Sequence, residues 1–348
     1  MRSRIALVVI SCFLSIAMGI FISRGRQAGP VPAGDDEVLV GLSMDTLKEA
    51  RWQKDKKFFV EKVRSLGAEV LVQAANSDDT IQVKNVEALI SRGVDVLVVV
   101  PHNGKAMAKA VRLAHRAGIP VIAYDRLIMD SDLDLYITFD GFKVGQMQAR
   151  YIVEEVLGDE QNIRIVRIYG SKMDHNAFLF KAGQDDVLEP YIKSGRIEVI
   201  HEDWAEDWKP ESAKKIVNAA ITNHGRDFDA ILASNDGTAG GAIQTLKEEG
   251  LTGKVAVTGQ DAELIACQRI VDGTQAMTIY KPIKDLAYKA AETAVKMARG
   301  RPVIAGDGVD NGKVEVPSVL LDVVVVTGEN LDETVIADGF HSREEVYR

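Results

Sequence analysis

The chain has 348 residues, of which 46% are hydrophobic and 27% charged, and a formal net charge of −9. This length predicts about two domains, and the composition is ordinary for a globular protein. The negative charge argues against nucleic acid as a partner, which requires a basic surface, and two cysteines cannot form a disulfide framework.

The N-terminal stretch has the features of an export signal. Arg2 and Arg4 precede an apolar run from Ile5 to Ile22, and a basic segment followed by an apolar one is typical of exported proteins. The run is long for a signal peptide and short for a membrane-spanning helix, and its small-residue cleavage site, residues 17–19, is weak. We expect residues 1–36 to be an export signal or a membrane anchor (residues 5–22) followed by a linker, and we slightly favour the anchor.

From Glu37 onward, strand and helix patterns alternate. We expect strands at residues 38–43, 70–73, 96–100 and 121–124, and helices at 49–66, 80–91 and 105–117. Gly67, Gly93 and Gly118 follow these helices, where glycine allows the backbone to turn back. Alternation of this kind predicts βαβ units that close right-handed into a parallel, doubly wound sheet.

The pattern restarts near residues 135–139. We expect further strands at 163–169, 197–201, 230–233, 255–258, 276–279 and 319–326, and helices at 143–157, 176–191, 211–222, 238–249, 263–271 and 283–297. So many strands predict a second sheet, and hence two similar α/β lobes joined by more than one crossing of the chain. We assign residues 37–139 and 283–316 to the first lobe, and 140–282 and 317–348 to the second.

Polar side chains follow many of the predicted strands. In an open α/β sheet, ligands bind outside the carboxyl ends of the strands. These ends carry Asp45, Asp125, Arg126, Asp140, Asp174, Asn176, Asn235, Asp236, Gln260, Asp261, Tyr280 and Lys281. Taken singly, Asp125 and Arg126 are explained by a surface ion pair, and most of the others by helix N-caps or turns. Together, the carboxylate, amide and guanidinium groups indicate a ligand rich in hydroxyl groups, such as a sugar.

The three tryptophans, Trp52, Trp204 and Trp208, also lie just after predicted strands. An indole ring packs well on the apolar C–H face of a sugar ring. Each tryptophan alone could equally be an ordinary hydrophobic residue at the edge of a lobe. In combination with the polar strand ends, we expect Trp52 and Trp208 to stack on a sugar and Trp204 only to pack.

Motifs of other chemistries are absent from the sequence. There is no G-x-G-x-x-G or Walker sequence, no H-E-x-x-H, no paired-cysteine metal site and no G-x-S-x-G. No acid/base pair for glycoside cleavage stands out among the carboxylates. We therefore expect no cofactor, no metal and no enzymatic activity. A carbohydrate-active enzyme is kept as an alternative hypothesis.

Several segments resemble the xylose-binding proteins of ABC sugar importers, which are related to the ribose- and galactose-binding proteins. These segments are 49–55 (EARWQKD), 92–97 (RGVDVL), 123–126 (AYDR), 233–236 (ASND), 238–242 (TAGGA), 259–261 (GQD), 280–283 (YKPI) and 338–341 (DGFH). The resemblance covers residues 37–341. It implies a type I periplasmic binding protein fold, with two doubly wound parallel-sheet lobes joined by a hinge of three crossings.

The resemblance also implies a site. Sugar hydrogen bonds would come from Arg51, Asp125, Arg126, Asp174, Asn176, Asn235, Asp261 and Lys281, and stacking from Trp52 and Trp208. Asp45 and Gln260 match family positions and are expected to support these residues from behind. Where the family has Asp-Asn-Asn, this chain has Asp174-His175-Asn176; the middle residue is not assigned to the sugar.

The implied function is extracytoplasmic binding of D-xylose or a similar pentose by hinge closure, with delivery to an ABC permease. An alternative is a membrane-anchored sensor that presents the liganded state to a sensor kinase or chemoreceptor. Repressors that share this fold carry a basic helix-turn-helix module where this chain has an apolar leader, so the repressor hypothesis fails. We expect the free protein to be a monomer.

Overall fold

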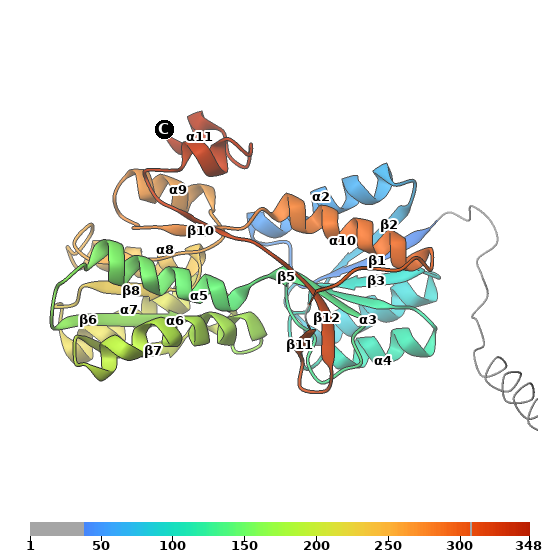
Figure 1. The fold of residues 1–348 in the computed structure, drawn as a ribbon, viewed down its shortest axis with the longest axis horizontal. Coiled ribbons are helices and arrows are strands. Elements are labelled where there is room, and N and C mark those ends of the chain that lie inside the picture. Colours follow the sequence, from blue (N-terminus) through green and yellow to red (C-terminus); the bar gives the residue numbers. More distant parts are fainter. Residues whose placement is uncertain (1–37, 307) are drawn as a thin grey trace, which may run out of the picture. The chain divides into compact units, whose positions relative to one another are not determined.

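The computed structural model describes residues 38–306 and 308–348 (Figure 1). The expected leader, including the apolar run at residues 5–22 and the linker up to residue 36, lies outside the described residues. Within the described ranges, no helix is both long enough and apolar enough to cross a bilayer.

The first lobe is built on a seven-stranded sheet in the order β11-β12-β5-β4-β3-β1-β2. Its strands are β1 (Leu39–Met44), β2 (Glu69–Ala74), β3 (Val96–Val99), β4 (Val121–Tyr124), β5 (Leu135–Phe139), β11 (Gly308–Asp310) and β12 (Glu315–Leu321). All pairings are parallel except that of β11 with β12. The central strands β3 and β4 are buried along their whole length, as the near-continuous apolar sequence of a doubly covered parallel sheet predicts.

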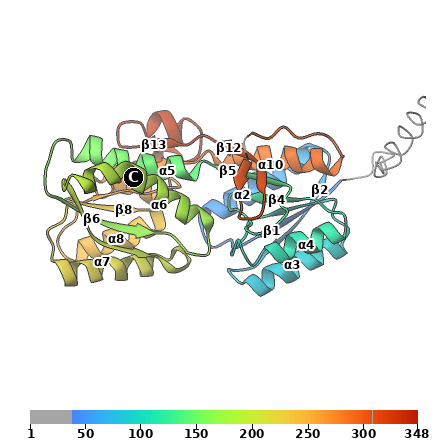
Figure 2. The same ribbon diagram turned by 60° about the horizontal axis from the view of Figure 1, so that its bottom comes forward.

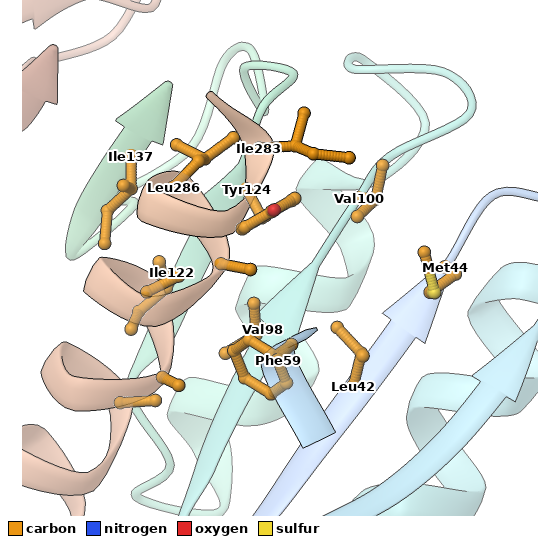
Figure 3. Packing of buried hydrophobic residues seen from close by; sticks show 14 of the residues in the cluster. Leu42, Met44, Phe59, Val98, Val100, Ile122, Tyr124, Ile137, Ile283 and Leu286 are labelled. Atoms are coloured by element: carbon orange, nitrogen blue, oxygen red, sulfur yellow. The ribbon is translucent and has the colours of Figure 1, made fainter. Parts of the chain in front are cut away.

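Helices cover both faces of this sheet. The helices α2 (Ala50–Ser65) and α10 (Ile283–Ala298) share one apolar core with one face, and α3 (Asp79–Ser91) and α4 (Ala108–Arg116) share a second core with the other. Figure 2 shows α3 and α4 side by side beneath the sheet. Figure 3 shows how Ile283 and Leu286 of α10 pack over Ile122, Tyr124 and Ile137 of the sheet.

The second lobe contains a four-stranded parallel sheet in the order β7-β6-β8-β9. Its strands are β6 (Ile163–Tyr169), β7 (Ile197–Trp204), β8 (Ala230–Ala233) and β9 (Ala256–Val257). One face packs on α5 (Gly141–Arg150), the π-helical turn η1 (Tyr151–Val156) and α6 (His175–Lys193). The other face packs on α7 (Pro210–His224) and α8 (Asp236–Glu248).

A smaller layer completes the second lobe. The strands β10 (Thr278–Tyr280) and β13 (Val324–Val326) form an antiparallel pair. Their core includes residues of α9 (Leu264–Val271), η3 (Asp332–Ile336) and α11 (Arg343–Val346). The remaining short element is the 3₁₀ turn η2 (Glu206–Trp208), which follows β7.

The chain passes between the two lobes three times, after β5, after β10 and after β12 (Figure 1). The last crossing corrects the sequence analysis, because the single strand expected at residues 319–326 is two strands, β12 and β13, in different lobes. The lobe boundary expected between residues 316 and 317 falls inside β12. Ser318 to Leu321 still pair with β5, so this crossing takes place at Asp322 and Val323.

Candidate functional site

All ten residues expected to bind a sugar line one cavity of about 60 Å³ between the two lobes. The cavity lies at the carboxyl ends of the strands, where the α/β rule places a ligand. The ten residues are Arg51, Trp52, Asp125, Arg126, Asp174, Asn176, Trp208, Asn235, Asp261 and Lys281. The volume suffices for only a few water molecules, because ion pairs between these side chains occupy much of the space.

Asp125 stands immediately after β4 in a tightly fixed turn. Its φ of 63° is in the left-handed region, which aspartate tolerates better than most residues. Its backbone N–H donates to the Ile137 carbonyl at 2.8 Å. Its own carbonyl accepts hydrogen bonds from Tyr136 Oη at 3.0 Å, Thr138 Oγ1 at 2.7 Å and Asn176 Nδ2 at 2.9 Å. These contacts hold the carboxylate at a defined position in the cavity.

Arg51, near the start of α2, joins carboxylates of both lobes. One terminal nitrogen pairs with Asp125 of the first lobe, and Nη1 lies 3.2 Å from Asp261 Oδ1 of the second. Asp55, one turn along α2, lies 3.5 Å from Nε. Lys281, on the second crossing, pairs with Asp261 at 2.8 Å. Burial raises the pKa of Asp125, but Arg51 and Lys281 outweigh it and hold that pKa below its ordinary value.

Arg126 repeats this arrangement with different partners. Its Nη1 lies 2.8 Å from Asp45 Oδ2 in the first lobe, and its Nε lies 2.9 Å from Asp174 Oδ2 in the second. Asp125 and Arg126 are only 3% and 8% exposed, so the alternative of a surface ion pair is wrong. Each of the two arginines therefore binds carboxylates from both lobes.

In the second lobe, two residues cap helices and also line the cavity. Asp174 caps α6 through the Asn176 N–H at 2.9 Å, and its other oxygen binds Arg126. Asn235 caps α8, with Oδ1 accepting from the Thr238 N–H at 2.9 Å and from the Thr238 hydroxyl at 2.8 Å. Because Oδ1 is engaged in this way, Asn235 offers its Nδ2 amino group to a ligand.

The tryptophans differ in how they are held. Trp52 is buried, with the guanidinium groups of Arg51 and Arg126 at 4.4 and 5.2 Å from its ring centroid. Trp208 lines the cavity, and its ring covers Gly170, where a Cβ atom would overlap it. Trp204 does not line the cavity. Its ring packs on Tyr169 and Phe178 at centroid distances of 4.9 and 4.6 Å.

The sequence analysis missed several residues of the cavity wall. Phe180 meets Trp208 edge-on at a centroid distance of 6.2 Å, and its place inside α6 gives no sequence signal. Glu49 and Glu263 line the cavity from opposite lobes, as do His102 and Asp207. Of these, His102 could have been found, because the sequence Pro101-His102 directly follows a strand in the same way as the other polar strand ends.

The cavity wall still offers polar atoms to a ligand. Among the described residues, Asp45 Oδ1, Gln260 Oε1, His102 Nε2 and Trp208 Nε1 are buried and have no hydrogen-bond partner. Buried polar groups are rarely left unpaired, so the wall is suited to a compact ligand with several hydroxyl groups. Over the described ranges, no cluster of three or more His, Cys, Asp or Glu is arranged to hold a metal ion.

Comparison with known proteins agrees with this geometry. The family model of the periplasmic binding protein domain matches residues 40–302. The chain belongs to the periplasmic binding protein family. This periplasmic binding protein is 48% identical over 316 residues to the D-xylose-binding periplasmic protein of Escherichia coli, covering 91% of this chain and 94% of that protein. It is 47% identical over 315 residues to the D-xylose-binding periplasmic protein of Haemophilus influenzae, covering 90% and 94%.

Solved structures place the periplasmic binding protein in the same fold. A carbohydrate transporter solute-binding protein from Chloroflexus aurantiacus, in complex with D-glucose, matches with a TM-score of 0.84 at 32% identity, covering 89% of this chain and 98% of that one. The resemblance and the type I fold inferred from the sequence are thereby confirmed. The family consists of binding proteins rather than enzymes, and membership implies a location outside the cytoplasm.

Proposed function

We propose that this periplasmic binding protein binds D-xylose, or a similar pentose, and delivers it to an ABC importer. The names of the Escherichia coli and Haemophilus influenzae relatives support the choice of sugar, since both are described as D-xylose-binding. D-Glucose differs from D-xylose by an additional hydroxymethyl group, so a comparison of the two sugars tests the choice of a pentose.

In this proposal the ten cavity residues are the sugar contacts. Carboxylates accept the hydroxyl protons, while Arg51, Arg126, Lys281 and the Asn235 amino group donate to the hydroxyl oxygens. Asn176 already donates to the Asp125 carbonyl and accepts from Tyr136, so it both supports Asp125 and faces the sugar. Trp52 and Trp208 would stack on the two faces of the ring.

Binding is coupled to closure of the lobes in this mechanism. We propose that residues 38–139 and 283–321 move as one body, and residues 141–280 and 324–348 as the other, about the three crossings. A sugar that contacts both lobes favours the closed state by its differential affinity for that state. It must also replace part of the Arg51–Asp261 and Arg126–Asp174 contacts that bridge the lobes without sugar.

The observation that carries this proposal is the convergence of all ten residues, from both lobes, on one cavity. Calorimetric titration with D-xylose, L-arabinose, D-ribose and D-glucose tests it. We expect D-xylose to bind most tightly and D-glucose clearly more weakly. Absence of binding to every pentose, or a preference for D-glucose, would overturn the proposed ligand.

For the partner, we propose an ABC permease that recognises the closed, liganded form. The sensor hypothesis differs only in the partner, and no contact within residues 38–306 and 308–348 favours it. We also propose that the free protein is a monomer and that residues 5–22 anchor it to the outer face of the cytoplasmic membrane. The N-terminus and membrane association of the natively expressed protein test the anchor, and a soluble form that begins shortly after Gly19 would overturn it.

A further inference from the structure

A histidine of the first lobe faces a carboxylate of the second at the edge of the cavity. His102 follows β3, and Asp207 lies in η2. The ring of His102 is held from behind by Asp79 at the start of α3, with Nδ1 and Asp79 Oδ1 2.8 Å apart. Its backbone N–H is fixed by Gln82 Oε1 at 2.9 Å. The other ring nitrogen, Nε2, lies 3.7 Å from Asp207 Oδ1.

This distance leaves His102 Nε2 buried and without a hydrogen-bond partner among the described residues. The two lobes need to approach by only about half an ångström here to form a normal hydrogen bond. A neutral imidazole that donates to Asp79 presents a lone pair to Asp207, whereas the imidazolium donates from both nitrogens. The contact across the lobes is therefore favourable only when His102 is protonated.

Asp207 is joined directly to a candidate stacking ring. Asp207 and Trp208 both have left-handed backbone, with φ of 49° and 59°. For residues other than glycine, this conformation persists only where surrounding contacts impose it. The Asp207 side chain also binds Lys209 Nζ at 2.9 Å. A second contact, to His102, would fix the loop from the opposite lobe and so fix the position of the Trp208 indole.

We propose that His102 and Asp207 form a proton-dependent latch between the two lobes, which positions Trp208 over the bound sugar. This inference rests on the proposed sugar-binding function and names a role for two residues outside the ten expected contacts. The latch forms as the lobes close, so sugar affinity contains a contribution that is present when His102 is charged and lost when it is neutral.

The charges around His102 are consistent with this role. Asp79 is the first residue of α3 and Asp78 its N-cap, and Asp207 and Lys209 lie on the opposite lobe. Arg126 donates to the carbonyl of Pro101, next to His102, at 3.3 Å. Arg126 is itself paired with Asp45 and Asp174.

A double-mutant cycle at two pH values tests the latch. D-xylose affinity is measured by calorimetry for wild type, His102→Gln, Asp207→Asn and the double variant at about pH 6 and about pH 8.5, which span the range in which histidine changes charge. We expect a coupling between the two positions of about fivefold in affinity at the lower pH and none at the higher. Because the coupling is a difference between variants, titration of other groups cancels from it.

A matched control comes from another histidine–aspartate pair. His115 Nε2 lies 2.8 Å from Asp134 Oδ2 within the first lobe and does not line the cavity. His115→Gln should leave D-xylose affinity unchanged at both pH values. Coupling that is equal at the two pH values, or absent from both, would overturn the latch while the proposed function stands. A wild-type protein that binds no sugar at either pH would overturn both.

Discussion

Asp125 in the first lobe and Asp261 in the second occupy corresponding positions in the two halves of the molecule. Each comes shortly after a parallel strand, β4 or β9, and each has left-handed backbone, with φ of 63° and 97°. Each donates its backbone N–H at 2.8 Å to a carbonyl of the next strand along the chain, Ile137 of β5 or Ile279 of β10. Both carboxylates bind Arg51.

The two differ in where Arg51 belongs. Arg51 and Asp125 lie in the same lobe, where Tyr136 and Thr138 also donate to the Asp125 carbonyl; a third donor, Asn176, comes from the second lobe. Asp261 reaches Arg51 only across the boundary between the lobes, and it binds Lys281 on the second crossing. If the lobes close on the sugar as proposed, the same strand-end geometry serves two purposes: in the first lobe it forms a fixed side of the cavity, and in the second it supplies a carboxylate that approaches and leaves Arg51.

The largest expected effect, that of Asp125→Asn, tests whether Asp125 is a fixed part of the first lobe. Asparagine tolerates the left-handed backbone but removes the charge, so Asp125→Asn should weaken D-xylose binding by about a hundredfold. It should also lower the melting temperature of the sugar-free protein, because Arg51 loses a buried partner within its own lobe. Calorimetry and thermal unfolding measure the two quantities.

Asp261→Asn is the matched comparison for this prediction. It should weaken binding to a similar extent but leave the sugar-free melting temperature closer to wild type, because its contact with Arg51 is not needed for the first lobe to fold. A larger loss of sugar-free stability in Asp261→Asn than in Asp125→Asn would contradict the proposal that Asp125 is a fixed part of the first lobe while Asp261 contacts it only across the lobes.

The tryptophans extend the comparison with an intermediate effect. Trp52 is held by two guanidinium groups in the first lobe, whereas Trp208 stands on a left-handed loop of the second. Trp208→Ala should lower D-xylose affinity by about tenfold, as expected for loss of one stacked ring. Trp204→Ala, which removes a ring packed on Tyr169 and Phe178 outside the cavity, should leave affinity nearly unchanged in the same titration. Equal losses in the two variants would contradict the assignment.

The smallest expected effect is on the pH dependence of stability, and it comes from buried carboxyl groups near the cavity in each lobe. Burial raises the pKa of Asp55 in the first lobe to about 6, partly offset by Arg51, and burial together with Glu263 raises the pKa of Asp236 in the second to about 8. Burial and the nearby Asp261 raise the pKa of Glu263 to about 7. A carboxyl whose pKa is higher in the folded than in the unfolded state contributes stability below the unfolded value, and this is lost as pH rises through the folded value.

Between about pH 6 and 8, therefore, Asp236 and Glu263 of the second lobe are the carboxyl groups of this set whose ionisation still lowers the stability of the folded protein as pH rises. The melting temperature of the wild type should fall over this interval, and Asp236→Asn should reduce the fall by about 3 °C. Asp55→Asn should alter the profile below pH 6 and follow wild type above it. Thermal unfolding across this pH range measures both, and an Asp236→Asn profile parallel to wild type would contradict the assignment.

The sequence was sufficient for the parts of the fold that depend on local pattern. Helices with an apolar stripe and a terminal glycine, and short apolar strands between them, appear within a few residues of their expected bounds. The crossing at Asp322 and Val323 could not be found in this way, because it lies inside a run that is apolar except for Asp322 and has no glycine or proline to mark a turn. The change of lobe there is decided by long-range pairing with β5 and β10.

In the site, strand-end chemistry identified which side chains gather but not how they pair. Asp125 and Arg126 are neighbours in sequence, yet the left-handed turn at Asp125 sends Arg126 to Asp45 and Asp174. Phe180 was missed because a phenylalanine within a helix is indistinguishable from a core residue. Pairing across the lobes requires the three-dimensional arrangement, which no single segment encodes.

The interleaved path of the chain also sets an order of assembly. The α10 helix, whose residues Ala287, Ala290, Ala291 and Ala294 are fully buried against the first sheet, comes after the second lobe's parallel sheet in the sequence. When a chain emerges from the ribosome N-terminus first, the part of the first sheet formed by residues 38–139 has one apolar face without its α10 cover until residues 283–321 are synthesised. The strands of the second parallel sheet, by contrast, lie within residues 163–257. Because contacts between distant segments form slowly, the first lobe's sheet, although it begins first in the sequence, is completed after the parallel sheet of the second lobe.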